Sequence, residues 1–158
     1  MPATGNNSCA SATGEPAAPS CWTNGASQLN TVWYSVVAPA SGKLKVRTAL
    51  GTLINTQIQL FSGSCGSLTS RGCSNDTTLC SNTQLWSELS FTGLTAGATY
   101  YVRVDGVNGL MGDFTITAID GNSNWPITPG QDCGAAFPVC NSSISVGDPG
   151  FIGSGNTC

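Results

Sequence analysis

The stretch GLTAGATYYVRVDG, residues 93–106, decides the fold class of this chain. A glycine-rich turn precedes a run that alternates between two sets of side chains: Tyr100, Val102 and Val104, and Tyr101, Arg103 and Asp105. Residues two positions apart in a strand point to the same face of a sheet. The run is therefore predicted to be a strand whose first set faces a core, while its second set faces water or another surface.

Similar alternation recurs along the chain between turn residues, whereas the periodicity of an amphipathic helix is almost missing. Further strands are expected within residues 31–38, 43–48, 54–61, 85–91 and 112–120. Within these segments, the residues expected to share one strand face are Leu44 and Val46; Ile54, Thr56, Ile58 and Leu60; Leu85, Ser87, Leu89 and Phe91; and Phe114, Ile116 and Ala118. Six or more short strands at this spacing predict an all-β sandwich or barrel.

The composition favours an extracellular protein and disfavours several function classes. Only 8% of the 158 residues are charged and the net charge is -3, so nucleic acid, which requires clustered Lys and Arg, is not expected as a partner. The chain has no histidine, the commonest general base and metal ligand at neutral pH. No apolar run reaches the length of a membrane-spanning helix, so direct membrane insertion is not expected.

Eight cysteines indicate disulfides formed in an oxidising compartment: Cys9, Cys21, Cys65, Cys73, Cys80, Cys133, Cys140 and Cys158. Zinc is the weaker alternative, because the spacings are irregular and no histidine is present. Short loops favour the pairs Cys9–Cys21, Cys65–Cys73 and Cys133–Cys140. Cys80 and Cys158 would then bond to each other or to partners outside the chain.

The chain divides into a β-rich module at residues 1–121, a Pro- and Gly-rich linker at 122–132, and a tail at 133–158. The tail echoes the head in short motifs, which predicts the start of a following module or a docking tail. The first residues, MPATGNN, lack the charged and apolar segments of a signal peptide. For an exported protein, we therefore expect this chain to be a piece of a longer one.

Three stretches together resemble the pre-peptidase C-terminal type of domain: NTVWYSVVAPASGKLKVRT (30–48), NTQIQLFSGSCGSLTSRGCSND (55–76) and GLTAGATYYVRVDGVNGLMGDFTI (93–116). The closest likeness is to the variant found in surface proteins of Bacteroidetes, although Phe61 stands where that variant usually has Tyr. The resemblance spans roughly residues 6–119. It implies a jelly-roll-like antiparallel β-sandwich, a hairpin between Phe61 and Asp76, export by the type IX route, and adhesion, ligand binding or spacing on the bacterial cell surface.

No constellation of residues predicts catalysis, and no catalytic residue is assigned. Two weaker patterns concern calcium and glycans. Asn75, Asp76, Asp105 and Asp113, with Asn108, supply the oxygen ligands that calcium prefers, in Gly-rich loops. The same residue types also favour turns for backbone reasons alone, so both interpretations stay open. Thr77, in the sequence DTT, matches a bacterial O-glycosylation pattern.

Two groups of residues are candidates for ligand binding. Lys43, Lys45 and Arg47 share one strand face and suit either an acidic polysaccharide or plain solvation at a sheet edge. Trp22, Trp86 and Trp125 lie outside the strand faces expected to be inward, and exposed rings stack on sugars. A sugar site is predicted at Trp22 or Trp86, with loop packing as the alternative. Trp33 and Tyr34 are expected in the core and at its rim.

The leading hypothesis is a non-enzymatic extracellular module of a long surface protein, acting in adhesion, spacing or assembly of a surface fibre. Its expected partners are neighbouring modules, copies of itself or a surface polysaccharide. The alternative is a carbohydrate-binding accessory module of a secreted hydrolase. No cofactor other than calcium is predicted.

Overall fold

The computed structural model describes residues 2–22, 29–79 and 82–124. Within these residues, the chain forms ten strands and one short 3-10 helix, η1. Their bounds are β1 Ala3–Asn6, β2 Val32–Val37, β3 Leu44–Leu50, β4 Thr56–Ser64, β5 Ser67–Asn75, β6 Thr77–Leu79, β7 Asn82–Gln84, β8 Glu88–Phe91, β9 Thr99–Gly106, η1 Val107–Gly109 and β10 Asp113–Asp120. The predicted all-β class is confirmed.

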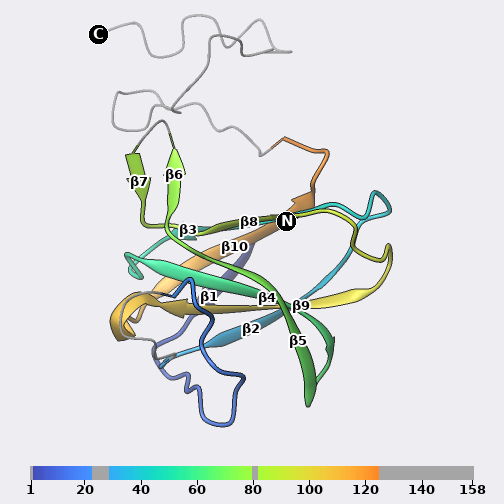
Figure 1. The fold of residues 1–158 in the computed structure, drawn as a ribbon. Coiled ribbons are helices and arrows are strands. Elements are labelled where there is room, and N and C mark those ends of the chain that lie inside the picture. Colours follow the sequence, from blue (N-terminus) through green and yellow to red (C-terminus); the bar gives the residue numbers. More distant parts are fainter. Residues whose placement is uncertain (1, 23–28, 80–81, 125–158) are drawn as a thin grey trace, which may run out of the picture.

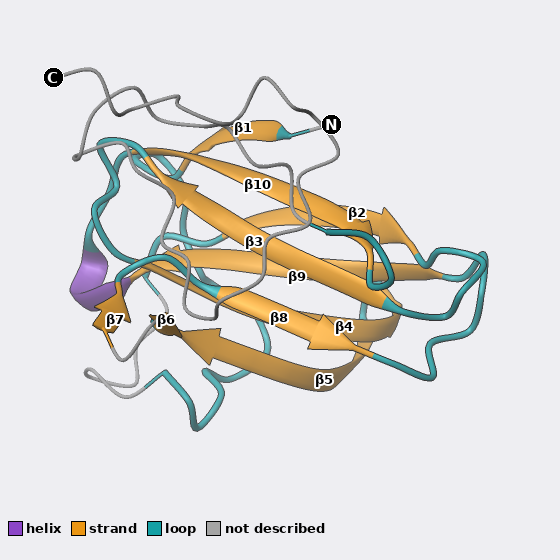
Figure 2. Ribbon diagram, turned by 90° about the horizontal axis from the view of Figure 1, so that it is seen from above, coloured by secondary structure: helices purple, strands orange, loops and turns teal. Residues whose placement is uncertain are grey.

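Eight of these strands form a jelly-roll sandwich of two antiparallel four-stranded sheets. Sheet A has the order β1-β10-β3-β8, and sheet B has the order β2-β9-β4-β5. Successive strands alternate between the two sheets for most of the chain, which is the winding of a jelly roll. The two layers lie face to face, and the small hairpin of β6 and β7 extends from one end (Figure 1). The long strands of both layers are seen from above in Figure 2.

The core lies between the sheets and is built from alternate residues of their strands. Val102 and Val104 of β9 are 1% and 0% exposed, and Ile58 and Leu60 of β4 are both 0% exposed. Other members of the same cluster are Leu44, Val46, Leu89, Tyr100, Phe114 and Ile116. The predicted inward face of the 93–106 stretch is therefore confirmed, because Tyr100 also packs inside.

Two predicted inward residues are exposed instead. Ile54 and Leu85 are 57% and 43% exposed, because β4 begins only at Thr56 and β8 only at Glu88. The alternation of apolar and polar residues in the sequence extends beyond the starts of both strands, where the chain is no longer in the strand conformation. Sequence reasoning also missed the short strands β1, β6 and β7, which are too brief for a periodic signal.

Buried hydroxyls connect the two sheets near one end of the core. Thr48 Oγ1 of β3 lies 2.7 Å from Thr56 Oγ1 of β4, and it accepts a hydrogen bond from the Ser87 backbone N–H at 2.9 Å. The Ser87 hydroxyl donates in turn to the Thr56 carbonyl at 2.6 Å. Each group in this cluster has a partner, so these buried polar atoms avoid the desolvation penalty of an unmade hydrogen bond.

The described sandwich ends with β10 at Asp120. Of the predicted linker, only residues 122–124 fall within the described part, and the predicted tail module at 133–158 lies outside it. Cys80, Trp125, Cys133, Cys140 and Cys158 also lie outside the described residues. No helix among the described residues is long and apolar enough to cross a membrane.

Candidate binding site on the outer face of sheet B

The outer face of sheet B is unusual because four of its polar residues are buried. Arg103 and Asp105 of β9 are both 0% exposed, and Gln57 and Gln59 of β4 are 3% and 2% exposed. The residues before β2 cover them. The sequence predicted that Arg103 faces outward or toward a sheet edge, so its complete burial is a correction. A strand buried on both faces requires a second covering layer, and here that layer is a loop.

The covering layer is the segment at residues 7–22, called here the N-terminal strap. A disulfide from Cys21 to Cys73 fastens the end of the strap to β5. The predicted pairs Cys9–Cys21 and Cys65–Cys73 are therefore wrong. The strap crosses the sheet and meets β5, so cysteines 52 positions apart become neighbours. Cys9 and Cys65 are exposed and are not bonded to another described cysteine.

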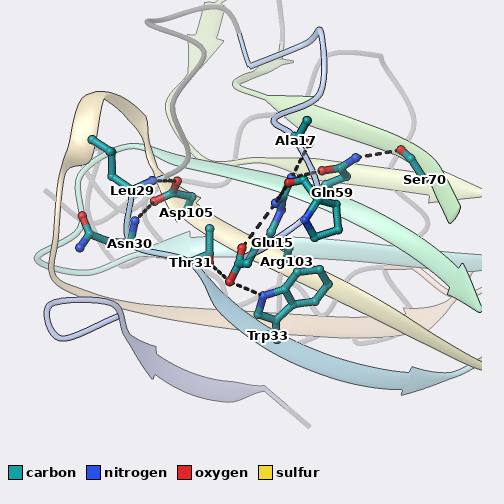
Figure 3. Close-up of polar contacts among 11 residues, drawn as sticks. Glu15, Ala17, Leu29, Asn30, Thr31, Trp33, Gln59, Ser70, Arg103 and Asp105 are labelled. Atoms are coloured by element: carbon teal, nitrogen blue, oxygen red, sulfur yellow. Dashed lines mark hydrogen bonds and ion pairs between the residues drawn. The ribbon is translucent and has the colours of Figure 1, made fainter. Parts of the chain in front are cut away.

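Arg103, on the outer face of sheet B, binds the middle of the strap through hydrogen bonds. Its guanidinium donates to the Pro16 carbonyl at 2.7 Å and the Ala17 carbonyl at 3.2 Å, both in the strap. It also donates to Gln59 Oε1 of β4 at 2.5 Å, and Gln59 donates on to Ser70 of β5 at 2.8 Å. These contacts run from the strap through the sheet to its edge strand (Figure 3).

Glu15 of the strap provides the negative charge that faces the guanidinium of Arg103. Its carboxylate lies 3.4 Å from Arg103, and it accepts hydrogen bonds from the Thr31 hydroxyl at 2.5 Å and the Trp33 indole N–H at 2.9 Å. Three donors therefore orient one carboxylate (Figure 3). Burial lowers the pKa of Arg103, and the Glu15 charge acts in the opposite direction.

Aromatic rings surround the guanidinium. The centroids of Trp22, Phe61 and Trp33 lie 4.8, 5.3 and 5.6 Å from the guanidinium carbon, within the range of cation–π attraction. Trp22 is only 4% exposed, and its indole N–H points to the Ile58 carbonyl at 3.4 Å. The expectation that Trp22 is exposed for stacking on sugars is wrong, because its ring packs on Arg103.

Asp105 fixes the chain that leads into β2. Its carboxylate accepts hydrogen bonds from the backbone N–H groups of Leu29, Asn30 and Gly106 at 2.9, 3.2 and 2.8 Å. Burial raises the pKa of Asp105, and these N–H groups act against that shift. The carboxylate oxygens of Asp105, which the sequence predicted as calcium ligands, therefore accept hydrogen bonds from backbone N–H groups instead.

Beside the strap, the outer face of sheet B opens into a groove of about 750 Å³. One wall is the strap at residues 14–16, and the other is the tip of the β4–β5 hairpin at residues 65–68. Between these walls, the lining residues are Trp33, Tyr34 and Ser35 of β2 and Tyr101 of β9. Ser35 and Tyr101 face each other across the β2–β9 pair, so they form one rung of the sheet.

The predicted basic face exists, but it lies on sheet A, away from the groove. Lys43 and Lys45 donate to Asn122 Oδ1 at 3.0 Å and the Ser123 carbonyl at 3.1 Å. Arg47 pairs with Glu88 at 2.7 Å and lies 4.5 Å from the centroid of Trp86. The two lysines thus bind the segment after β10, and Arg47 contacts the ring of Trp86. Ligand binding by Lys43, Lys45, Arg47 or Trp86 stays a prediction.

The remaining predicted site residues are dispersed. The Asp113 carboxylate accepts hydrogen bonds from the Asn6 side-chain amide at 2.7 Å and the Thr52 hydroxyl at 3.3 Å, and the Asp113 backbone N–H donates to the Thr52 hydroxyl oxygen at 2.7 Å. Asn75 ends β5, Asp76 has a φ of 63°, and the Thr77 hydroxyl is buried, which disfavours glycosylation of the folded chain. In the part of the chain that the structure covers, no three His, Cys, Asp or Glu side chains gather as a metal site would require.

The sequence did not predict the groove, because the groove depends on the register between β2 and β9 and on the position of the strap. One signal was available: Arg103 lies on the same strand face as Tyr101, and a lone arginine within an apolar strand is rarely left without partners. Comparison with known proteins found no matching family model, curated protein or solved structure. The assignment of a site therefore rests on the geometry described above.

Proposed function

We propose that this chain is a non-catalytic binding module of an exported cell-surface protein, with the groove as its binding site. The observation that carries the proposal is the groove itself, a hollow of about 750 Å³ lined by aromatic and small polar side chains. Ligand sites are concave, mostly apolar and few per protein, with volumes of about 300–1,000 Å³. The proposal favours adhesion over a purely mechanical spacer, because a spacer does not need such a hollow.

The support beneath the groove is consistent with a preformed site. Its strap wall is held by Arg103 and by the Cys21–Cys73 disulfide, and its floor belongs to a four-stranded sheet. Sites on well-supported elements bind with less loss of conformational freedom. The carboxylate of Glu15, which lines the groove, already accepts from three donors, so we assign it a positioning role rather than a chemical one.

Export is supported by the disulfide and by the composition. Disulfides persist in oxidising compartments, and the low content of charged residues suits an extracellular setting. A covalent link between the strap and β5 also limits the unfolded ensemble of a module exposed to mechanical load. The resemblance to surface modules of Bacteroidetes, drawn from the sequence motifs, points to the same location.

Beads coated with the chain test the proposal directly. They are washed over cellulose, chitin, collagen and a lawn of beads that carry the same chain, and the retained beads are counted. We expect retention on at least one surface. Ser67→Trp places a large ring on the exposed hairpin wall of the groove and is expected to reduce retention at least tenfold.

Ser90→Trp serves as the matched control, because Ser90 is exposed on β8 of the opposite sheet. The control should retain beads as well as the wild type does. Absence of retention on every surface, or equal retention by Ser67→Trp and the wild type, would contradict the proposed function.

A further inference from the structure

The chemistry of the groove identifies a class of ligand. This inference rests on the proposed function, since it assumes that the groove binds. We infer that the groove takes a segment of an uncharged polysaccharide, with a sugar ring stacked on Tyr101 and sugar hydroxyls bonded to the serines beside it. The site differs from both tryptophan sites predicted from the sequence.

The charges around the groove favour a neutral ligand. Glu15 is the acidic side chain of the lining, and the buried Arg103 compensates it at 3.4 Å. No Lys or Arg lines the groove within the described part of the chain, and the basic face of Lys43, Lys45 and Arg47 lies on the opposite sheet. An anionic ligand would find no counter-charge here, whereas a neutral one would not need it.

The polar side chains of the groove favour a ligand that is rich in hydroxyl groups. Ser35, Ser67 and Tyr101 line the groove, and among the described residues their hydroxyls have no side-chain hydrogen bond. Each hydroxyl offers one donor and acceptor lone pairs. Sugars present the same groups, so the two surfaces are complementary. An apolar ligand would leave these hydroxyls without partners in a desolvated site, which is costly.

The aromatic ring of Tyr101 favours a ligand that can stack on it. Tyr101 is partly exposed between the two walls, and Trp33 lies beside it on the same outer face of the sheet. Trp33 is fixed by its hydrogen bond to Glu15 and by packing against Phe61 at a centroid distance of 5.2 Å. Rigid aromatic side chains that combine an apolar face with a polar tip lose little entropy on binding. A sugar ring has one apolar face that such a ring can cover.

Affinity gel electrophoresis tests the inference with six polysaccharides cast separately in native gels. The neutral set is barley β-glucan, laminarin, xyloglucan and galactomannan, and the anionic set is alginate and polygalacturonate. We expect retardation by at least one neutral polysaccharide and by neither anionic one. Tyr101→Ala should weaken the apparent affinity at least tenfold, and Tyr101→Phe, which keeps the ring, should weaken it less.

Trp86→Ala is the matched control, because Trp86 is an aromatic residue partly exposed on the sheet A side, and its variant should bind as the wild type does. The inference would be overturned if Trp86→Ala lost binding to the polysaccharide while Tyr101→Ala still bound it. It would also be overturned if only the anionic polysaccharides retarded the protein.

Absence of any retardation, together with no retention of beads on cellulose or chitin, would also overturn it. If beads are then retained on collagen or on beads that carry the same chain, and Ser67→Trp abolishes that retention, the groove binds a protein, and only the ligand class is wrong. If Ser67→Trp beads bind as wild-type beads do, the proposed function fails as well.

Discussion

Replacement of Arg103 by methionine is the most informative perturbation of the fold. The guanidinium is fully buried, donates to Pro16, Ala17 and Gln59, and pairs with Glu15. Hydrogen bonds to charged groups contribute about 1.5–3 kcal/mol each, but the contributions within one network are not additive. Removal of one member of a buried pair typically costs about 3–5 kcal/mol, because the partner is left uncompensated. We expect Arg103→Met to lower the free energy of unfolding by that amount.

Urea denaturation followed by tryptophan fluorescence measures this loss. Arg71→Met is the matched control, since Arg71 is exposed on β5, and its effect should stay within about 0.5 kcal/mol. Glu15→Gln keeps an amide acceptor for Thr31 and Trp33 and should cost less than Arg103→Met. The double variant should show coupling of about 0.5–3 kcal/mol. A loss below about 1 kcal/mol for Arg103→Met would refute the idea that Arg103 holds the strap.

Three further outcomes follow from the same structure. Replacement of Cys21 and Cys73 by alanine should cost about 4 kcal/mol in chemical denaturation, from a closed loop of 52 positions; an unchanged midpoint would be inconsistent with the bond. The pKa of Asp105 is raised from 3.8 by burial, so the folded state binds more protons, and the free energy of unfolding of the wild type relative to Asp105→Asn should fall as pH rises from 3.8 through the folded pKa. A relative stability that rises over that interval would show that the carboxylate is stabilised in its charged form. Thr48→Val should cost about 1–3 kcal/mol by calorimetry, because the Ser87 N–H and the Thr56 hydroxyl lose a buried partner, and a neutral effect would argue against the hydroxyl cluster.

The architecture could be predicted because alternation is a local signal. The runs around Val46, Ile58, Val102 and Ile116 mark their inward faces by sequence alone, and the structure buries all four side chains. The two sheets then follow from the number of strands and the need to cover one apolar face of each. The positions of the strand ends could not be predicted in the same way, because Ile54 continues the alternation but lies before β4 and is exposed.

The site could not be predicted, because it depends on contacts between distant parts of the chain. Glu15 and Arg103 are 88 positions apart, and nothing in either neighbourhood indicates the other. Alternation places Arg103 on the face opposite the core, but it does not say that a loop covers this face. The same loop buries Trp22 and brings Cys21 to Cys73, which overturns the predicted exposure of Trp22 and both disulfide pairs predicted for these cysteines.

The central claim is that the groove on sheet B is where this module binds a neutral sugar chain. The most direct measurement is a backbone amide NMR titration with an oligosaccharide fragment of the neutral polysaccharide that binds the protein most tightly. We expect shift changes that saturate at Trp33, Ser35, Ser67 and Tyr101, with the amides around Trp86 unchanged. Saturating changes confined to the outer face of sheet A, or none at any oligosaccharide concentration, would contradict it.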